Sequence, residues 1–170
     1  MARDHARLLI SIWSDCDFTA LTSRQQIVYL AMASSPDLSW CGVLPLAPGR
    51  MSDLSSDMTE NRVRSDTKSL EAARFIVTDS HTAEVLVRTY IHHDGILGQP
   101  NVTKACIRAL SRCHSEAILE AIKVELGREL QRDPGARGWP IVRSESPDLF
   151  EELQARSSRN PSRNPFRKAM

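Results

Sequence analysis

His92, His93 and Asp94 form the group of adjacent residues with the clearest potential for metal chemistry. Imidazole and carboxylate groups are ligands of first-row transition metals, so the group raises the question of a metal or nuclease site. Adjacent residues of an extended segment point to opposite sides, however, and neither an HExxH helix nor a second carboxylate cluster accompanies them. We therefore expect a loop packed between neighbouring elements and no metal site here.

Cys106, Cys113 and His114 form a second group of this kind. A separation of seven residues places the two thiols on one face of a helix. Zinc needs four ligands, which are normally delivered by close pairs from two segments, and the four cysteines contain no CxxC pair. The thiols are therefore expected to be free and to pack in the core.

Motifs for catalysis are not found in the sequence. Neither GxSxG nor a glycine-rich phosphate loop occurs. Four acidic residues lie near expected helix starts, where they cap a helix or favour its dipole but form no catalytic pair. They are Asp53, Asp57, Glu60 and Asp66. The sequence thus predicts a protein that is not an enzyme and has no cofactor.

The stretch "TENRVRSDTK" contains the best candidate for a binding surface. Thr59 is expected to cap a helix, and Asn61, Arg64, Ser65 and Lys68 then follow at spacings of three and four, which places them on one helix face. Arginine and asparagine make bidentate contacts to guanine and adenine edges, while lysine and serine hold phosphates. This row either contacts double-stranded DNA or faces water, and the neighbouring elements decide between the two.

Three residues outside the row complete the candidate DNA-binding set. Arg62 is a candidate phosphate contact beside the row, His81 lies in the turn "DSHTA", and Arg88 lies near the base of the expected hairpin. The turn fits a solvated loop as well as a wing that reaches the DNA, and Asp79 opposes a close approach of phosphate there. Arg74, which lies off the row, is expected to be structural.

The elements that position these residues are mostly helices. A Thr or Ser cap paired with Gln25 or Gln26 predicts a helix over 23–33, and a proline at the first helical position predicts another over about 48–55. Between them "GVLPL" is interrupted by proline and predicts an edge strand. Leu8 to Trp13 fits either a helix or a short buried strand.

The helix capped by Thr59 is expected to run to Ala73 and to face inward with Val63, Thr67, Leu70 and Ala73. The runs "FIVTD" and "EVLVRTYI" then predict a β-hairpin. Apolar periodicity over 100–130, with a new helix start at Ser115, predicts a helical hairpin that either completes the core or forms a subunit interface, the latter as a homodimer.

The C-terminal region is rich in Pro, Ser and Arg. From 154 onward it carries five cations and no acid, which are Arg156, Arg159, Arg163, Arg167 and Lys168. Such a stretch is either a solubilising disordered end or an arm that binds phosphates nonspecifically. We expect 134–170 to be mostly disordered, with one short helix at "DLFEELQAR".

Composition limits the class of protein. The chain has 170 residues, of which 41% are hydrophobic and 25% charged, as in soluble globular proteins. A net charge of +1 gives no global argument for nucleic acid, and 5% aromatic residues argue against large stacking platforms. No apolar run is long enough to span a bilayer and the N-terminus does not read as a secretory signal, so we expect a cytoplasmic protein.

The order helix, short strand, helix, helix, hairpin is that of a winged helix-turn-helix domain. With that order, the segments "MARDHARLLISIW", "CGVLPL", "SLEAARFIV" and "LVRTYIHHDGILGQPNV" resemble the N-terminal winged-helix domains of phage replication initiators and replisome organisers, and related actinobacteriophage helix-turn-helix proteins. The resemblance covers about 1–103. It implies sequence-specific binding of double-stranded DNA through the helix at 59–73 and a wing near 79–84.

The expected fold is therefore mainly α with a small β-hairpin: a winged helix-turn-helix domain at 1–98, a helical hairpin at 99–133 and the tail at 134–170. The expected function is replication initiation or transcriptional control, with a replication or transcription protein as a further partner. The alternative is a non-catalytic adaptor that binds a host or phage protein through the same scaffold.

Overall fold

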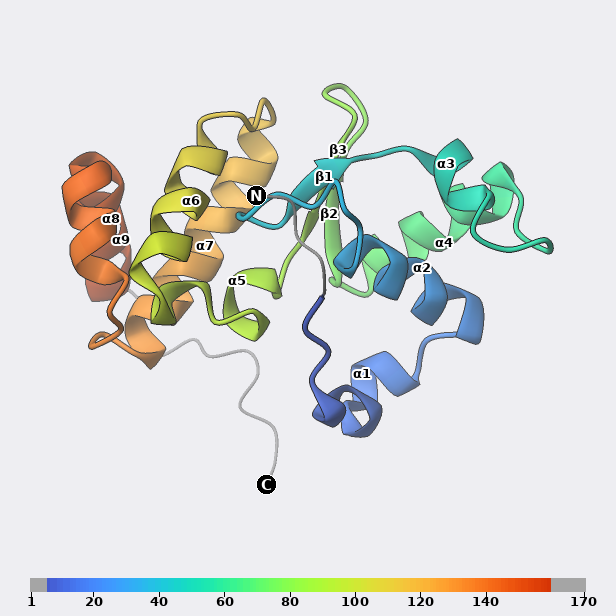
Figure 1. Cartoon of the computed structure of the whole chain (residues 1–170), viewed down its shortest axis with the longest axis horizontal. Coiled ribbons are helices and arrows are strands. Elements are labelled where there is room, and N and C mark those ends of the chain that lie inside the picture. The colour runs from blue at the N-terminus through green and yellow to red at the C-terminus, as the bar shows by residue number, and fades with distance from the viewer. Residues whose placement is uncertain (1–5, 160–170) are drawn as a thin grey trace.

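The computed structural model describes residues 6–159 as a mainly helical protein, 60% helix, with one three-stranded antiparallel sheet. In Figure 1 the sheet lies between two groups of helices, α1–α4 on one side and α6–α9 on the other, with α5 near the middle. In chain order the elements are η1 (Ile10–Ser14), α1 (Cys16–Thr19), α2 (Ser23–Ala33), β1 (Val43–Pro45), α3 (Pro48–Ser52), α4 (Glu60–Ala72), β2 (Ile76–Asp79), β3 (Glu84–Val87), α5 (Tyr90–His93), η2 (Ile96–Gly98), α6 (Pro100–Leu110), α7 (Glu116–Arg132), α8 (Trp139–Glu145) and α9 (Pro147–Arg159).

Helix α2 begins where the sequence predicts. Thr22 accepts a hydrogen bond from the Gln25 N–H, and the Gln25 side chain accepts one from the Thr22 N–H, which completes a capping box. Ahead of it, η1 is a short 3₁₀ helix with no buried residue, so the alternative of a buried strand at the N-terminus is wrong. Phe18 of α1 is fully buried instead, edge-on to the Tyr29 ring at 5.9 Å.

Helix α4 buries one face under α2 and α3. Val63, Thr67 and Leu70 are buried, as expected, but Ala73 is exposed because it is the C-cap. Arg74 follows with φ 65, in the left-handed position that ends the helix, which agrees with a structural role. The helix is thus held by an apolar face, and its opposite face is polar.

The sheet has the strand order β1-β3-β2, and both pairings are antiparallel. The prediction of an edge strand is confirmed for β1. Its outer side is occupied, because Val43 donates to Ser39 Oγ at 3.1 Å and accepts from the Ser39 N–H at 2.8 Å, and Pro45 has no N–H. On the outer side of β2, the Thr78 N–H donates to Glu71 Oε1 at 2.7 Å.

The second expected strand is shorter than the apolar run that predicted it. Strand β3 ends at Val87, and Tyr90 to His93 form the short helix α5 rather than a continuation of the strand. The last strand pair is Ile76 with Val87; the Arg88 N–H still donates to the Phe75 carbonyl at 3.2 Å, and Thr89 is then the N-cap of α5. His92 and His93 of the "HHD" group are therefore the last two residues of a helix, and Asp94 is its C-cap, so the group does not lie on an extended segment.

The expected helical hairpin is present as α6 and α7. Ser115 caps α7 by accepting a hydrogen bond from the Ile118 N–H at 3.1 Å, which confirms the predicted helix start. Cys106, Ile118 and Ile122 are buried in one continuous core with the residues of the N-terminal half. The hairpin thus completes the core of the chain.

The expectation of a mostly disordered region from 134 onward is wrong for its described part. Helices α8 and α9 pack on α6 and α7, and Trp139, Val142 and Leu153 are buried. These helices cover apolar surface of α6 and α7, the two helices that were expected either to complete the core or to form a homodimer interface. Arg163, Arg167 and Lys168 lie outside the described residues.

Candidate nucleic-acid interface

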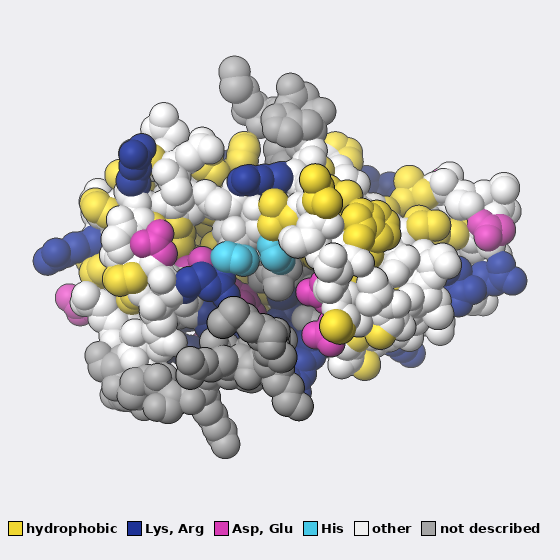
Figure 2. Space-filling model, turned by 90° about the horizontal axis from the view of Figure 1, so that it is seen from below, with side chains coloured by type: hydrophobic (Ala, Val, Ile, Leu, Met, Phe, Trp, Pro, Cys, Tyr) yellow, Lys and Arg dark blue, Asp and Glu magenta, His cyan; other side chains and the backbone are white. Residues whose placement is uncertain are grey.

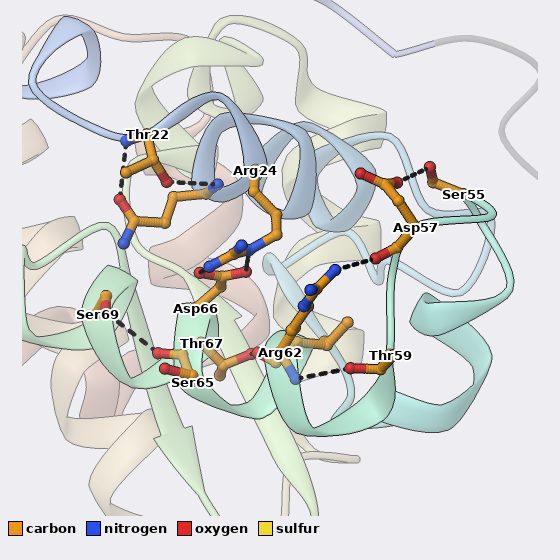
Figure 3. Close-up of polar contacts among 12 residues, drawn as sticks. Thr22, Arg24, Ser55, Asp57, Thr59, Arg62, Ser65, Asp66, Thr67 and Ser69 are labelled. Atoms are coloured by element: carbon orange, nitrogen blue, oxygen red, sulfur yellow. Dashed lines mark hydrogen bonds and ion pairs between the residues drawn. The ribbon is translucent and has the colours of Figure 1, made fainter.

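The exposed face of α4 carries the residues that the sequence singled out. With 3.6 residues per turn, Asn61, Ser65 and Lys68 lie opposite the buried side chains and are exposed. In the part of the chain that the structure describes, neither the Asn61 nor the Lys68 side chain has a hydrogen-bond or ion-pair partner. The carbonyl of Ser65 accepts a hydrogen bond from Ser69 Oγ at 3.1 Å (Figure 3). The centre of this face is therefore ready to donate and accept hydrogen bonds.

Thr59 and Arg62 have structural roles at the start of the helix. The Thr59 hydroxyl accepts a hydrogen bond from the Arg62 N–H at 3.4 Å and acts as the N-cap. The Arg62 guanidinium points back along the chain and donates to the Asp57 carbonyl at 2.6 Å, as Figure 3 shows. Arg62 remains exposed, but a phosphate would have to compete with this carbonyl.

Arg64 lies at one edge of the exposed face and not at its centre. Its Nε and one terminal nitrogen both donate to Glu60 Oε1, at 3.0 and 2.5 Å. The two side chains are 57% and 50% exposed, so this ion pair is accessible to solvent and to a ligand. The sequence predicted the position of Arg64 on the surface but not its pairing with the acid one turn before.

The four acidic residues near α3 and α4 have different roles. Asp53 is the C-cap of α3, Asp57 accepts a hydrogen bond from Ser55 Oγ, and Glu60 lies in the first turn of α4 as expected from the helix dipole. The Ser55 bond lowers the pKa of Asp57. Asp66 differs from the expectation: it lies mid-helix and is 2% exposed.

Asp66 is paired with Arg24 of α2, a contact that the sequence reading missed. Arg24 Nε donates to Asp66 Oδ2 at 2.5 Å and its Nη2 to Oδ1 at 3.2 Å, in a bidentate pair that crosses from α2 to α4 (Figure 3). These hydrogen bonds raise the pKa of Arg24. The pair fixes α4 against α2. In the sequence, this pair is indicated only by the acidic residue at a position of α4 that faces inward with the apolar residues.

The β2–β3 turn presents His81 to solvent. Asp79 Oδ1 accepts from the N–H groups of His81, at 2.9 Å, and Thr82, at 3.4 Å, which shapes the turn. A hydrogen bond from the Ser115 side chain lowers the pKa of Asp79. Asp79 is therefore engaged within the protein, and His81 is exposed at the tip together with Ser80.

The base of this turn is attached to the N-terminus of α7. Glu84 accepts hydrogen bonds from the N–H groups of His114, at 3.1 Å, and Ser115, at 2.8 Å. Partial burial raises the pKa of Glu84, but these hydrogen bonds outweigh it, so that the pKa lies below its ordinary value. The hairpin is thus held by the second group of helices as well as by the sheet.

Arg88 does not lie where a phosphate contact needs it. Its Nη2 donates to Glu125 Oε1 of α7 at 2.9 Å, and its Nη1 donates to the Arg74 carbonyl at 3.1 Å. The two charged side chains are 16% and 14% exposed. Arg88 therefore connects the hairpin to α7, and we correct its assignment from a DNA contact to a structural ion pair.

Replacing Arg88 by alanine is expected to lower thermal stability while leaving unchanged the salt dependence of the DNA binding that we propose below. The variant leaves the half-buried Glu125 without its partner from the hairpin, although Arg128 still contacts it. Thermal unfolding and DNA titrations at several salt concentrations measure the two effects. A shallower salt dependence with unchanged stability would return Arg88 to the DNA interface.

The two groups with metal-ligand chemistry differ in burial: His92 and His93 are exposed at the end of α5, so the expectation of a packed loop is wrong for them, whereas Cys106 lies in the core. His92 Nδ1 lies 3.2 Å from Glu129 Oε2 of α7. Cys106 is buried and burial raises its pKa, while Cys113 lies beyond the end of α6 rather than on the same helix face, with burial raising its pKa to about 11. Among residues 6–159 no group of three or more His, Cys, Asp or Glu side chains is placed to hold a metal ion.

No helix within the described range has the length and apolar character needed to cross a membrane. In comparisons with known proteins, no family model, curated protein or solved structure matches the chain.

Proposed function

We propose that this chain is a sequence-specific double-stranded DNA-binding protein that inserts α4 into the major groove and uses the β2–β3 turn as a wing. The order α2, β1, α3, α4, β2, β3 and the strand order β1-β3-β2 are those of a winged helix-turn-helix domain. A recognition helix of this kind contacts base edges with its exposed side chains. The proposed role is replication initiation or transcriptional control.

The observation that carries the proposal is the exposed face of α4. It is free of apolar side chains apart from Ala72 and Ala73 at its end, and Asn61 and Lys68 project from it without a partner among the described residues. Asparagine can make a bidentate contact to adenine, and lysine can hold a phosphate. Because the Arg24–Asp66 pair holds the opposite side of α4, this face has a fixed orientation.

The charge distribution predicts few phosphate contacts. Net charge is +1, and on the face drawn in Figure 2 Lys and Arg side chains are scattered, with acidic side chains among them. A protein of this kind gains little affinity from counterion release. Its binding should therefore depend on base contacts and vary weakly with salt.

Replacing Lys68 by alanine tests the proposal. The variant should bind all duplexes more weakly, and the slope of log K against log salt should become shallower by about 1, because one phosphate contact is lost. The preferred sequence should not change. The measurement is a titration against duplexes selected from a random pool, at several salt concentrations.

The control for this test is Lys104→Ala, which removes the same charge from α6, where Lys104 pairs with Glu145. Its binding slope should match that of the wild type. Equal slopes for wild type and K68A would remove Lys68 from the interface, and a wild type that selects no sequence would reject the DNA-binding proposal.

A protein-interaction adaptor is the second candidate, and one observation favours it. Leu8, Ile10 and Trp13 around η1 are 51%, 88% and 55% exposed. The three come from one short segment of the chain, and exposed apolar side chains mark a protein contact when they form a patch. If the purified protein ignores DNA and binds a host or phage protein instead, with that binding lost in Ile10→Ser, the adaptor function is the correct one.

A further inference from the structure

We infer that Glu60 and Arg64 act as one specificity-determining unit that reads a G·C base pair in the major groove and rejects A·T pairs at that position. The inference rests on the proposed DNA-binding function. It assigns Glu60, which on its own only favours the helix dipole, a role in choosing the bound sequence.

The geometry of the pair is that of a combined donor and acceptor. Arg64 directs Nε and one terminal nitrogen to Glu60 Oε1, at 3.0 and 2.5 Å. Within the described part of the chain, the second carboxylate oxygen of Glu60 and the second terminal nitrogen of Arg64 make no hydrogen bond. The pair therefore presents an unused acceptor beside an unused donor.

The position of the pair on α4 is on the side of the proposed wing. Glu71 lies seven residues after Arg64, about two helical turns, and so on the same edge of the helix. Its carboxylate accepts hydrogen bonds from the N–H and Oγ1 of Thr78 in β2, at 2.7 and 2.8 Å. The pair thus lies on the same edge of α4 as Glu71 but near the N-terminal end of the helix, where a Cβ at Gly49 of α3 would meet Glu60 Oε2 at 3.7 Å. Asn61 and Lys68 occupy the centre of the exposed face.

The chemistry of this pair matches one base pair edge. In the major groove, guanine offers N7 and O6 as acceptors, and its partner cytosine offers the N4 amino group as a donor. Arginine donates to guanine and glutamate accepts from cytosine N4. The i, i+4 contact keeps the two side chains together, so a G·C edge can replace part of their mutual hydrogen bonding.

The acid also explains the rejection of other sequences. A carboxylate is repelled by phosphates and so weakens nonspecific binding, which makes it an unfavourable residue on a surface that merely attracts DNA. Opposite thymine it would face the O4 acceptor instead of an amino group, and this repulsion penalises the wrong base. The same residue therefore lowers affinity for most sequences and raises discrimination for one.

The experiment selects duplexes from a random pool with the wild-type chain and with Glu60→Gln. The wild type should select a motif with an invariant G·C pair at one position, and replacing that pair by A·T should weaken its binding about 5- to 150-fold. E60Q should lose this preference or move it towards adenine, because glutamine contacts adenine N6 and N7. The other positions of the motif should stay the same.

The matched control is Glu116→Gln. Glu116 is the first residue of α7 after its cap Ser115, as Glu60 is the first residue of α4 after Thr59, so both substitutions remove an acid from the same helix position. E116Q should select the wild-type motif.

The outcomes separate the two proposals. Identical motifs for wild type and E60Q, with DNA bound by both, would overturn the role of the pair and leave the proposed function intact. Failure of the wild type to select any sequence would overturn the proposed function itself.

Discussion

Replacing Leu153 by alanine will lower the free energy of unfolding by about 2–5 kcal/mol, the cost of removing a buried leucine side chain. Leu153 is 0% exposed in α9, which packs on α7 and α8. The loss combines the transfer free energy of the removed atoms with a cavity in the core. Urea denaturation followed by circular dichroism measures it.

The control for this substitution lies on the same helix. Glu151 is exposed, and Glu151→Ala should change stability by no more than about 0.5 kcal/mol. Equal midpoints for wild type and L153A would show that α9 does not fold onto the rest of the chain. A truncation after Leu153 would delete Arg156. Because Arg156 forms ion pairs with Glu120 of α7 and Glu152 of α9, this truncation would remove a contact between the two helices.

Replacing Gly138 by alanine is expected to destabilise the protein by about 1–3 kcal/mol through overpacking. A Cβ at this position would lie 2.8 Å from the Leu97 carbonyl oxygen and 3.0 Å from Leu97 Cα, and it would also meet Thr103 Oγ1. Two of these atoms belong to backbone and cannot rotate away. The Gly138 N–H also donates to the Leu97 carbonyl at 2.8 Å, so the same shift would weaken that bond. Thermal or urea unfolding measures the change.

Replacing a second glycine should change the stability in the opposite direction, and that variant serves as the control. Gly127 lies within α7, and a Cβ there would meet no atom within 4 Å. Gly127→Ala should therefore raise stability by about 0.5–1 kcal/mol, because alanine loses less conformational freedom in a helix. A Gly138→Ala variant as stable as Gly127→Ala would contradict the close packing of α8 against η2 and α6.

Local signals in the sequence predict much of the fold. The starts of α2, α4 and α7 follow from Thr22, Thr59 and Ser115, because a cap and the residues that it bonds lie within one helical turn. The hairpin follows from two β-rich runs around a polar turn, and the edge position of β1 from Pro45. Each of these features depends on residues close together in the chain.

Contacts between distant residues could not be predicted in this way. Arg24 and Asp66 are separated by 42 positions, and Arg88 and Glu125 by 37, so nothing local identifies either pair. Asp66 was predicted to cap a helix or favour its dipole and Arg88 to contact phosphate, and both side chains instead form ion pairs between elements.

The C-terminal region shows the same limit. Leu149, Phe150 and Leu153 have helical spacing, but the polar residues around them reduce the apolar signal, and the surface that buries them belongs to α7 and α8. The weak periodicity in the sequence predicts only a short helix. The folded chain supplies the partner surface that makes the helix stable.

The outer strands of the sheet determine how copies of the protein can meet. An unpaired strand edge is a template for a strand of another molecule, and this is a common route to domain swapping and fibril formation. Here the Val43 backbone is already bonded to Ser39, Pro45 offers no donor, and the Thr78 N–H is bonded to Glu71. Neither edge is open to strand addition at these positions, so the part of each edge that they form cannot pair with a strand of another copy.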